Sequence, residues 1–175
     1  MARVLLVGCG CRGRELAARL RADGHAVRGT TRDPAGREAI AAAGAEPWVG
    51  DPDRVATLTA ALEGVSLVCW LLGSARGAPD ALAALHDQRL GFFLGRLTDT
   101  GVRGFVYEAA GTVDPRALAR GAEVVRQGAS TIPLPVAIVD ADPADPAGWT
   151  DQMQSAAGGL LDSQRARNRA KSIGI

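Results

Sequence analysis

Short apolar runs alternate along this chain with longer segments in which the apolar positions recur at helical spacing. The apolar runs predict strands over residues 4–7, 26–31, 47–49, 66–72, 102–107 and 135–139. The segments between them predict helices over residues 14–20, 34–43, 53–62, 79 to about 100, and 114–127. Strands that are apolar throughout and alternate with helices indicate a parallel sheet whose two faces are both covered by helices.

The order of these elements predicts an α/β fold, a doubly wound parallel sheet (Rossmann) of six strands in the order 3-2-1-4-5-6. A ligand of such a sheet is expected at the carboxyl ends of strands one and four, where the strand order reverses. We expect residues 1–140 to form this domain. Residues 141–175 are expected to add a loop and a C-terminal helix, over residues 152–171, to the same domain.

A glycine-rich turn follows the first strand and precedes the first helix, with the pattern G-x-G-x-x-G. The first glycine permits a tight turn, the second lets the backbone approach a pyrophosphate, and the third lets the helix pack close to the strand. The free N–H groups and the dipole of the helix then hold the phosphates. The strand–turn–helix context therefore predicts a dinucleotide site. Its residues would be Gly8, Gly10, Cys11, Arg12 and Gly13.

The residues that end the second strand distinguish two cofactors. An Asp or Glu there would bind the ribose diol of NAD, whereas arginine and hydroxyl groups suit the 2′-phosphate of NADP. The chain offers Thr30, Thr31 and Arg32, with Arg12 adding charge, so we expect NADP rather than NAD. Asp33 leaves two alternatives: it caps the next helix, or it binds the ribose and reverses the preference.

Residues 4–14, 24–34 and 49–51 resemble the atypical short-chain dehydrogenase/reductases, including NmrA-like and epimerase-like members. The resemblance implies an NAD(P)-binding Rossmann domain over residues 1–140. It also implies that Asp51 contacts the adenine and that Leu72 and Gly73 line the cofactor. The glycine pattern departs from the TGxxGxxG of the typical members.

The catalytic pair of that family, Tyr-x-x-x-Lys, is absent. The chain has one tyrosine, Tyr107, and one lysine, Lys171, and no hydroxyl residue directly follows the fifth strand. Glu108 stands there instead and is a weak candidate for a general acid if burial raises its pKa. The alternative is that Glu108 pairs with Arg103 or Arg76.

Further titratable residues have plainer interpretations. We expect Tyr107 to lie in the core and His86 on a helix surface. Cys9 and Cys11 are expected to be small residues of a crowded turn; the alternative is a thiol pair whose pKa the helix N-terminus lowers. The cysteines and histidines lack the spacing of a metal site, so none is expected.

Composition limits the remaining possibilities. The 175 residues carry a net charge of +1, which provides no field to attract nucleic acid. No apolar stretch approaches the roughly 20 residues of a membrane span, and residues 1–3 lead into a strand rather than a signal peptide. We therefore expect a cytoplasmic protein without nucleic-acid or membrane partners. The basic residues near the C-terminus (Arg165, Arg167, Arg169 and Lys171) predict a solvated helix, with a homodimer contact or an anionic docking site as alternatives.

These observations lead to two functional hypotheses. The first is an NADP(H)-binding protein that reduces a small-molecule acceptor such as a flavin- or quinone-like ring. The second is a non-catalytic sensor or regulatory protein that responds to NAD(P). A nucleoside-cofactor methyltransferase is a weaker third hypothesis, because no acidic residue ends the second strand.

Overall fold

The computed structural model describes residues 1–172 and contains a six-stranded parallel sheet in the order β3-β2-β1-β4-β5-β6. The strands are β1 (Arg3–Val7), β2 (Ala26–Thr31), β3 (Glu46–Val49), β4 (Leu67–Trp70), β5 (Phe105–Glu108) and β6 (Val136–Val139). The predicted fold class and strand order are confirmed. The strand order reverses between β1 and β4, which places the expected ligand position at their carboxyl ends.

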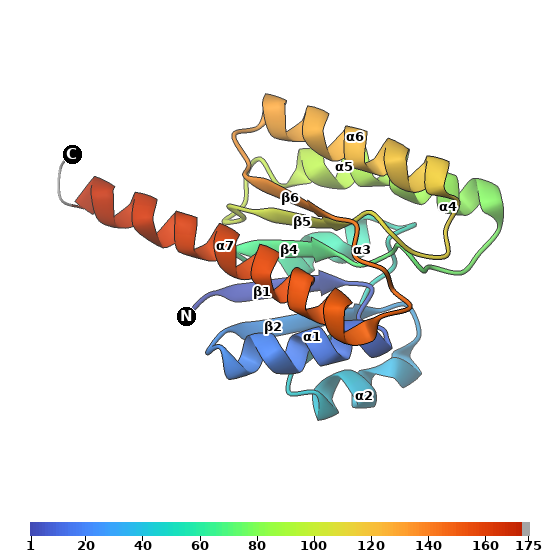
Figure 1. Cartoon of the computed structure of the whole chain (residues 1–175), viewed down its shortest axis with the longest axis horizontal. Helices are drawn as coiled ribbons and strands as arrows, with labels where there is room; N and C mark the ends of the chain where they lie inside the picture. The colour runs from blue at the N-terminus through green and yellow to red at the C-terminus, as the bar shows by residue number, and fades with distance from the viewer. Residues whose placement is uncertain (173–175) are drawn as a thin grey trace.

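Helices cover both faces of the sheet (Figure 1). One face carries α1 (Cys11–Ala22), α2 (Arg37–Ala42) and α7 (Pro146–Ser172). The other face carries α3 (Ala56–Thr59), α4 (Pro79–His86), α5 (Gln88–Arg96) and α6 (Pro115–Thr131). Two short 3-10 turns, Pro34–Gly36 and Ala60–Leu62, precede α2 and follow α3.

The hydrophobic core has one part on each side of the sheet. Alternate residues of a strand point to opposite faces, so β1 sends Leu5 and Val7 to one part and Val4 and Leu6 to the other. All four side chains are fully buried. A strand that must be apolar on both faces reads as a continuous hydrophobic run, which is why β1 was recognisable from sequence.

The limits of three predicted helices differ most from the structure. The helix expected from residue 79 to about 100 is interrupted at Asp87 (φ −121°, ψ −91°), whose carboxylate pairs with Arg120 at 3.1 Å. The helix expected over 53–62 is only α3 and the turn after it. The last helix starts six residues earlier than expected, at Pro146 rather than residue 152. Asp145 precedes it and accepts a hydrogen bond from Gly148 N at 3.1 Å, as an N-cap does.

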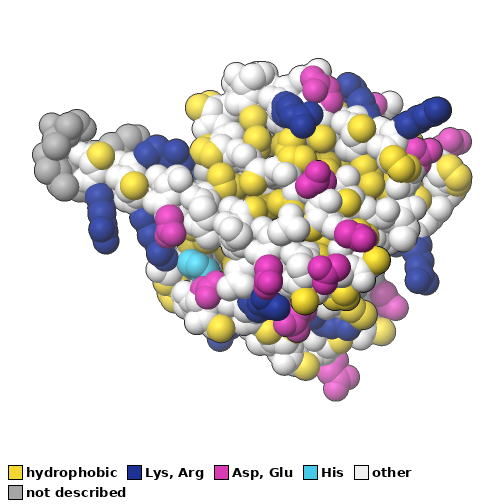
Figure 2. All heavy atoms as spheres, in the orientation of Figure 1, with side chains coloured by type: hydrophobic (Ala, Val, Ile, Leu, Met, Phe, Trp, Pro, Cys, Tyr) yellow, Lys and Arg dark blue, Asp and Glu magenta, His cyan; other side chains and the backbone are white. Residues whose placement is uncertain are grey.

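The long helix α7 crosses the sheet beside α1 and projects beyond it toward the C-terminus (Figure 1). Basic side chains are spread along the projecting part (Figure 2), where Arg165, Arg167 and Arg169 are exposed. Arg165 pairs with Asp162 one turn earlier at 3.3 Å. The side chain of Lys171 lies outside the described residues.

Apolar side chains also gather on the surface between α6 and α7 (Figure 2). They overlie β6, the edge strand, whose residues Val136, Ala137 and Ile138 are half-buried. In residues 1–172 no helix combines the length and the hydrophobicity that crossing a membrane requires.

Candidate functional site

A cavity of about 460 Å³ lies where the sheet order reverses, at the carboxyl ends of β1, β2, β3 and β4. Its wall brings together all but one of the residues that the sequence predicted for the cofactor. These are Gly8, Gly10, Cys11, Arg12, Gly13, Thr30, Thr31, Arg32, Asp51 and Leu72. The exception is Gly73. The loop after β4, including Ser74 and Arg76, adds to the wall.

The three glycines of the turn have the geometry that their predicted roles require. Gly8 has φ +88°, and a Cβ there would lie 2.7 Å from Leu71 O, so only glycine fits. A Cβ on Gly10, the N-cap of α1, would meet no atom within 4 Å, so the space in front of this helix N-terminus is open. A Cβ on Gly13 would lie 3.3 Å from Gly8 O, which reflects the close packing of α1 against the turn.

Thr30 holds the glycine turn against β2. Its hydroxyl accepts a hydrogen bond from Gly8 N, and its carbonyl accepts one from Cys9 N, both at 2.9 Å. The residue is only 1% exposed. The next hydroxyl, that of Thr31, donates to the carbonyl of Asp33 at 3.0 Å. Both threonines therefore shape the cavity wall through contacts within the protein.

Arg32 and Arg76 lie beside each other at the rim of the cavity. Arg32 is exposed, and its guanidinium is 3.5 Å from the carbonyl oxygen of Arg76. Asp33 is directed elsewhere: its carboxylate accepts from Ala35 N at 2.9 Å and caps the following turn. The capping alternative for Asp33 is therefore the one that the geometry favours.

Asp51 follows β3 and closes the outer end of the cavity. One carboxylate oxygen accepts a hydrogen bond from Asp53 N at 3.0 Å. The backbone N–H of Asp51 donates to the Thr57 hydroxyl at 2.8 Å. These contacts fix the turn after β3 and leave Asp51 half-buried at the cavity wall.

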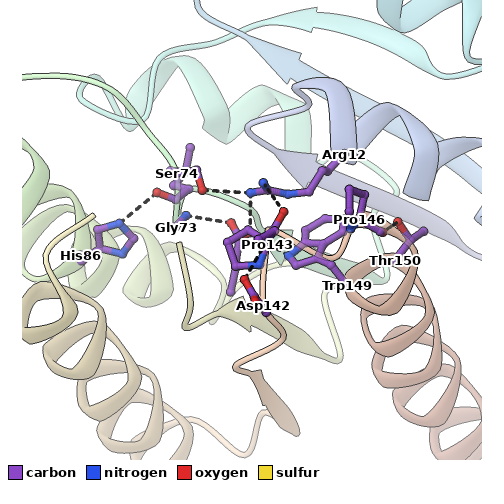
Figure 3. A network of polar contacts seen from close by, with 12 residues as sticks. Arg12, Gly73, Ser74, His86, Asp142, Pro143, Pro146, Trp149 and Thr150 are labelled. Carbon is purple, nitrogen blue, oxygen red and sulfur yellow. Dashed lines mark hydrogen bonds and ion pairs between the residues drawn. The ribbon is translucent and has the colours of Figure 1, made fainter. Parts of the chain in front are cut away.

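The inner end of the cavity is closed by a polar network around Arg12 (Figure 3). The Arg12 guanidinium donates to the Ser74 hydroxyl at 3.0 Å and pairs with Glu108 at 3.2 Å. It also lies over the ring of Trp149, 5.1 Å from the ring centroid. Three separate parts of the chain, the glycine turn, the end of β5 and the start of α7, meet here.

Glu108 is the buried centre of this network. It is 1% exposed and accepts hydrogen bonds from Gly73 N and from Trp149 Nε1, each at 2.8 Å, besides the Arg12 contact. Burial raises the pKa of the Glu108 carboxyl, while these three donors oppose the rise. The expected partners Arg103 and Arg76 were wrong, because the side chain of Arg103 turns away from Glu108 and donates to backbone carbonyls of residues 100 and 102.

Gly73 is buried beneath the segment that follows β5. A Cβ on Gly73 would lie 2.2 Å from Ala110 O, and one on Gly111 would lie 1.8 Å from Gly73 O. Val113 N donates to Gly73 O at 3.0 Å. Gly73 is therefore not part of the cavity wall, and its role in lining the cofactor stays a prediction.

His86 is fully buried, so the expectation of a surface histidine was wrong. Its Nδ1 lies 2.7 Å from the Tyr107 hydroxyl and its Nε2 lies 3.2 Å from Leu72 O. Burial lowers the pKa of His86 to about 4, so the ring is neutral near pH 7. A neutral ring then donates from Nε2 to Leu72 O and accepts from Tyr107, which lies in the core as expected.

The cysteines do not form a reactive pair. Cys9 is 5% exposed, and burial raises the pKa of its thiol to about 11. The thiol-pair alternative requires a lowered thiol pKa, so the structure does not support it for Cys9. Cys11 is exposed and accepts a hydrogen bond from Arg14 at 3.3 Å. Among residues 1–172, no cluster of three or more His, Cys, Asp or Glu side chains is arranged to hold a metal ion.

Trp149 is the residue of this network that sequence reasoning missed. It stands in a segment rich in Pro, Asp and Ala, and its hydrogen-bond partner Glu108 is 41 positions away. No local pattern connects two residues at that separation. Only the return of α7 across the sheet brings them together.

Comparison with known proteins gives the same fold and a family. The model of the NAD(P)H-binding family matches residues 8–118. An Agrobacterium tumefaciens short-chain dehydrogenase/reductase superfamily protein, solved with bound NAD, is 24% identical with a TM-score of 0.64, over 78% of this chain and 48% of that one. A Bacillus halodurans protein described as an NAD-dependent epimerase/dehydratase is 20% identical with a TM-score of 0.67, over 81% and 71%.

A third similar structure is the UDP-glucose 4-epimerase of Thermotoga maritima with UDP-glucose, which is 12% identical with a TM-score of 0.65. The match covers 78% of this chain and 54% of that one. This chain thus spans about half the length of the first of these structures and of the epimerase. No curated protein sequence matches the chain significantly.

Proposed function

This chain belongs to the NAD(P)H-binding family, and we propose that it binds NADP(H), with NAD as the less favoured cofactor. The observation that carries the proposal is the open space at Gly10, where the N-terminus of α1 faces the cavity. Free N–H groups and the helix dipole at such a position bind phosphate. The adenosine would extend from there along the ends of β2 and β3, toward Asp51.

The preference for NADP rests on the cavity rim. Arg32 and Arg76 lie side by side beyond Thr31, where the 2′-phosphate of the adenosine ribose would lie. The carboxylate that directly follows Arg32, Asp33, caps the next turn through one of its oxygens, and the carboxylates of the cavity wall, Asp51 and Asp53, lie after β3, where the adenine would lie. Two arginines at this position favour a phosphate over a diol.

Two activities of the bound cofactor are compatible with the site. Hydride transfer to a flavin- or quinone-like acceptor needs little acid catalysis, because the reduced ring itself stabilises the negative charge. A non-catalytic sensor needs none. The position of Glu108 favours the sensor: this carboxyl, the candidate acid, is 1% exposed and is held by Arg12, Trp149 and the N–H of Gly73.

Calorimetric titration with NADPH, NADH and S-adenosylmethionine tests the binding proposal. We expect NADPH to bind most tightly. Arg32→Ala should lower the ratio of the NADPH affinity to the NADH affinity about tenfold or more, since a charge-assisted phosphate contact contributes roughly 1.5 to 3 kcal/mol. Arg126→Ala, on the surface of α6, is the matched control and should change nothing. Equal affinities for NADPH and NADH, with Arg32→Ala neutral, would contradict the NADP assignment.

Gly10→Val tests the phosphate position. We expect this variant to lose NADPH binding and keep its fold, because the added side chain enters the open space in front of α1. Circular dichroism would report the fold and calorimetry the binding. A Gly10→Val protein that binds as tightly as the wild type would place the phosphates elsewhere.

NADPH oxidation assays separate the two activities. We expect no measurable reduction of simple ketones, because general acid catalysis contributes about 10²- to 10⁴-fold and no Tyr-Lys pair is present. Turnover with flavins or quinones would support the reductase. Binding of NADPH without turnover of any acceptor would support the sensor.

A further inference from the structure

We propose that the site takes only the adenosine diphosphate half of its cofactor, because the chain's own side chains fill the half where the second nucleotide would lie. The proposal rests on the proposed NADP(H) binding and specifies which part of that ligand is recognised. A dinucleotide lies across the point where the strand order reverses, with one half on each side. In this fold one half of the binding site lies over β1, β2 and β3, and the other half lies over β4, β5 and β6.

The half over β1, β2 and β3 is open. Its wall is made of the glycine turn, the ends of β2, β3 and β4, the loop after β4 and one side of α4. Backbone N–H groups at α1, the arginines at the rim and Asp51 give this half the polar groups that a diphosphate and an adenosine need. The residues involved are Gly10, Arg32, Asp51 and Arg76.

The half over β5 is filled by side chains of the protein itself (Figure 3). Arg12 reaches from the glycine turn to Glu108, and Trp149 covers both, with its indole N–H on the same carboxylate oxygen that Arg12 contacts. Trp149 is 1% exposed, so its ring is packed on all sides. Within residues 1–172 the cavity wall includes Glu108 as its single residue from β5 and none from β6.

The backbone closes the same region from the side of β4. Segment 109–113 lies directly on Gly73, in contacts so close that neither Gly73 nor Gly111 has space for a Cβ. Val113 N donates to Gly73 O at 3.0 Å, which fastens the segment there. At the end of β4, Gly73 is therefore covered at the place where a nicotinamide riboside would have to pass, whereas Leu71 and Leu72 line the open half.

Opening this half would be costly. Moving Arg12 and Trp149 away would leave the buried Glu108 carboxylate without two of its three side-chain and backbone donors. It would also draw the start of α7 out of the core, where Trp149 and Met153 are both buried. The ligand half that lies beyond the diphosphate is thus directed out of the cavity, toward solvent.

One consequence concerns the oxidation state of the cofactor. NADP⁺ and NADPH differ only in the nicotinamide ring, which in this arrangement contacts no part of the site. The protein would then bind NADP⁺, NADPH and 2′-phospho-ADP-ribose alike, and respond to the total amount of 2′-phosphorylated adenosine diphosphate ligand.

Calorimetry with these three ligands tests the inference. We expect dissociation constants within about threefold of each other, since the nicotinamide adds no contact. An affinity for 2′-phospho-ADP-ribose more than tenfold below that for NADPH would overturn it. Failure of all three to bind would refute the proposed function itself, so the two failures are distinguishable.

A saturation-transfer NMR experiment on the unmodified protein provides a second measure. Protons of the adenine ring of bound NADPH should receive saturation from the protein, and those of the nicotinamide ring should not. Comparable saturation of both rings would contradict the inference. The measurement needs no variant, so it holds even where a substitution disturbs folding.

Trp149→Ala and Trp149→Phe form a matched pair of variants. Trp149→Ala should vacate part of the filled half and raise the affinity for NADPH relative to 2′-phospho-ADP-ribose at least threefold. Trp149→Phe keeps a ring there and should leave the ratio near that of the wild type. A folded Trp149→Ala protein with an unchanged ratio would count against the role of Trp149.

Discussion

Two neighbouring residues of β5 serve different purposes because their side chains point to opposite faces of the sheet. Tyr107 packs in the core part beneath α4 and α6, where its hydroxyl contacts His86. Glu108 points toward α7 and the cavity, where it meets Arg12 and Trp149. Strand alternation thus places the neutral Tyr107–His86 pair and the Glu108–Arg12 ion pair on opposite faces of the sheet, although Tyr107 and Glu108 are adjacent in sequence.

The neutral pair makes the stability of the protein depend on pH. The pKa of His86 falls from 6.5 to about 4 on folding, so between these values the unfolded chain takes up a proton that native His86 does not. Stability is therefore lost as the pH falls from 6.5 toward 4. At about 1.4 kcal/mol per pKa unit, the loss amounts to at most about 3.5 kcal/mol.

Denaturation of the wild type and of His86→Gln at pH 7 and pH 4.5 would measure this dependence. We expect the advantage of the wild type over the variant to shrink at the lower pH, because glutamine does not titrate. Other titrating groups, including Glu108, affect both proteins equally and cancel in the difference. A difference that stays constant with pH would mean that His86 has the same pKa in the native and in the unfolded protein.

At the scale of elements, the packing of α6 against β5 depends on a glycine. Gly121 is the contact point: a Cβ there would lie 2.0 Å from the Tyr107 hydroxyl and 3.1 Å from His86 O. Glycine has a low intrinsic helix propensity, so its presence inside α6 reflects this contact rather than helix stability. The approach also places Leu118 O of α6 3.2 Å from the Tyr107 hydroxyl, whose one proton is donated to His86 Nδ1.

Two glycine-to-alanine substitutions separate packing from propensity. Gly121→Ala should lower the free energy of unfolding by about 1 to 3 kcal/mol, because Tyr107 must move. Gly158→Ala in α7 has no atom within 4 Å of the new Cβ and should instead stabilise the protein by about 0.5 to 1 kcal/mol. Chemical denaturation would measure both. Stabilisation by Gly121→Ala would contradict the packing described here.

At the scale of the whole molecule, α7 completes one face of the sheet. Trp149, Met153, Ala157 and Leu161 recur at helical spacing and are all buried in the core part shared with α1. The same helix brings Trp149 to the inner end of the cavity. The stability of that face and the shape of the ligand site therefore depend on one element.

Met153→Ala tests this dependence. The side chain is fully buried, so its truncation should cost about 2 to 5 kcal/mol of unfolding free energy. Gln152→Ala, on the exposed side of the same helix, is the control and should stay within about 0.5 kcal/mol of the wild type. A Met153→Ala protein as stable as the wild type would show that α7 is dispensable for the core.

The sequence by itself determined the fold class, the strand order and the place of the glycine turn. Each of these depends on residues that are neighbours in the chain: the apolar run of β1, the glycines after it and the first helix are contiguous. Periodicity and turn chemistry are local properties, so they can be read without knowing the rest of the structure. The break of the long helix at Asp87 was not predicted, because Asp87 faces Arg120, a residue of another helix 33 positions away.

Only the tertiary structure decided how the inner end of the site is built. The Glu108 carboxylate finds its donors 96 positions earlier in Arg12, 35 earlier in Gly73 and 41 later in Trp149. His86 likewise became a core residue because Tyr107, 21 positions later, offers it a buried hydroxyl. Hydrophobic patterning states which side chains are buried but not which polar groups meet inside, because those partners are chosen by the crossing of strands and helices in space.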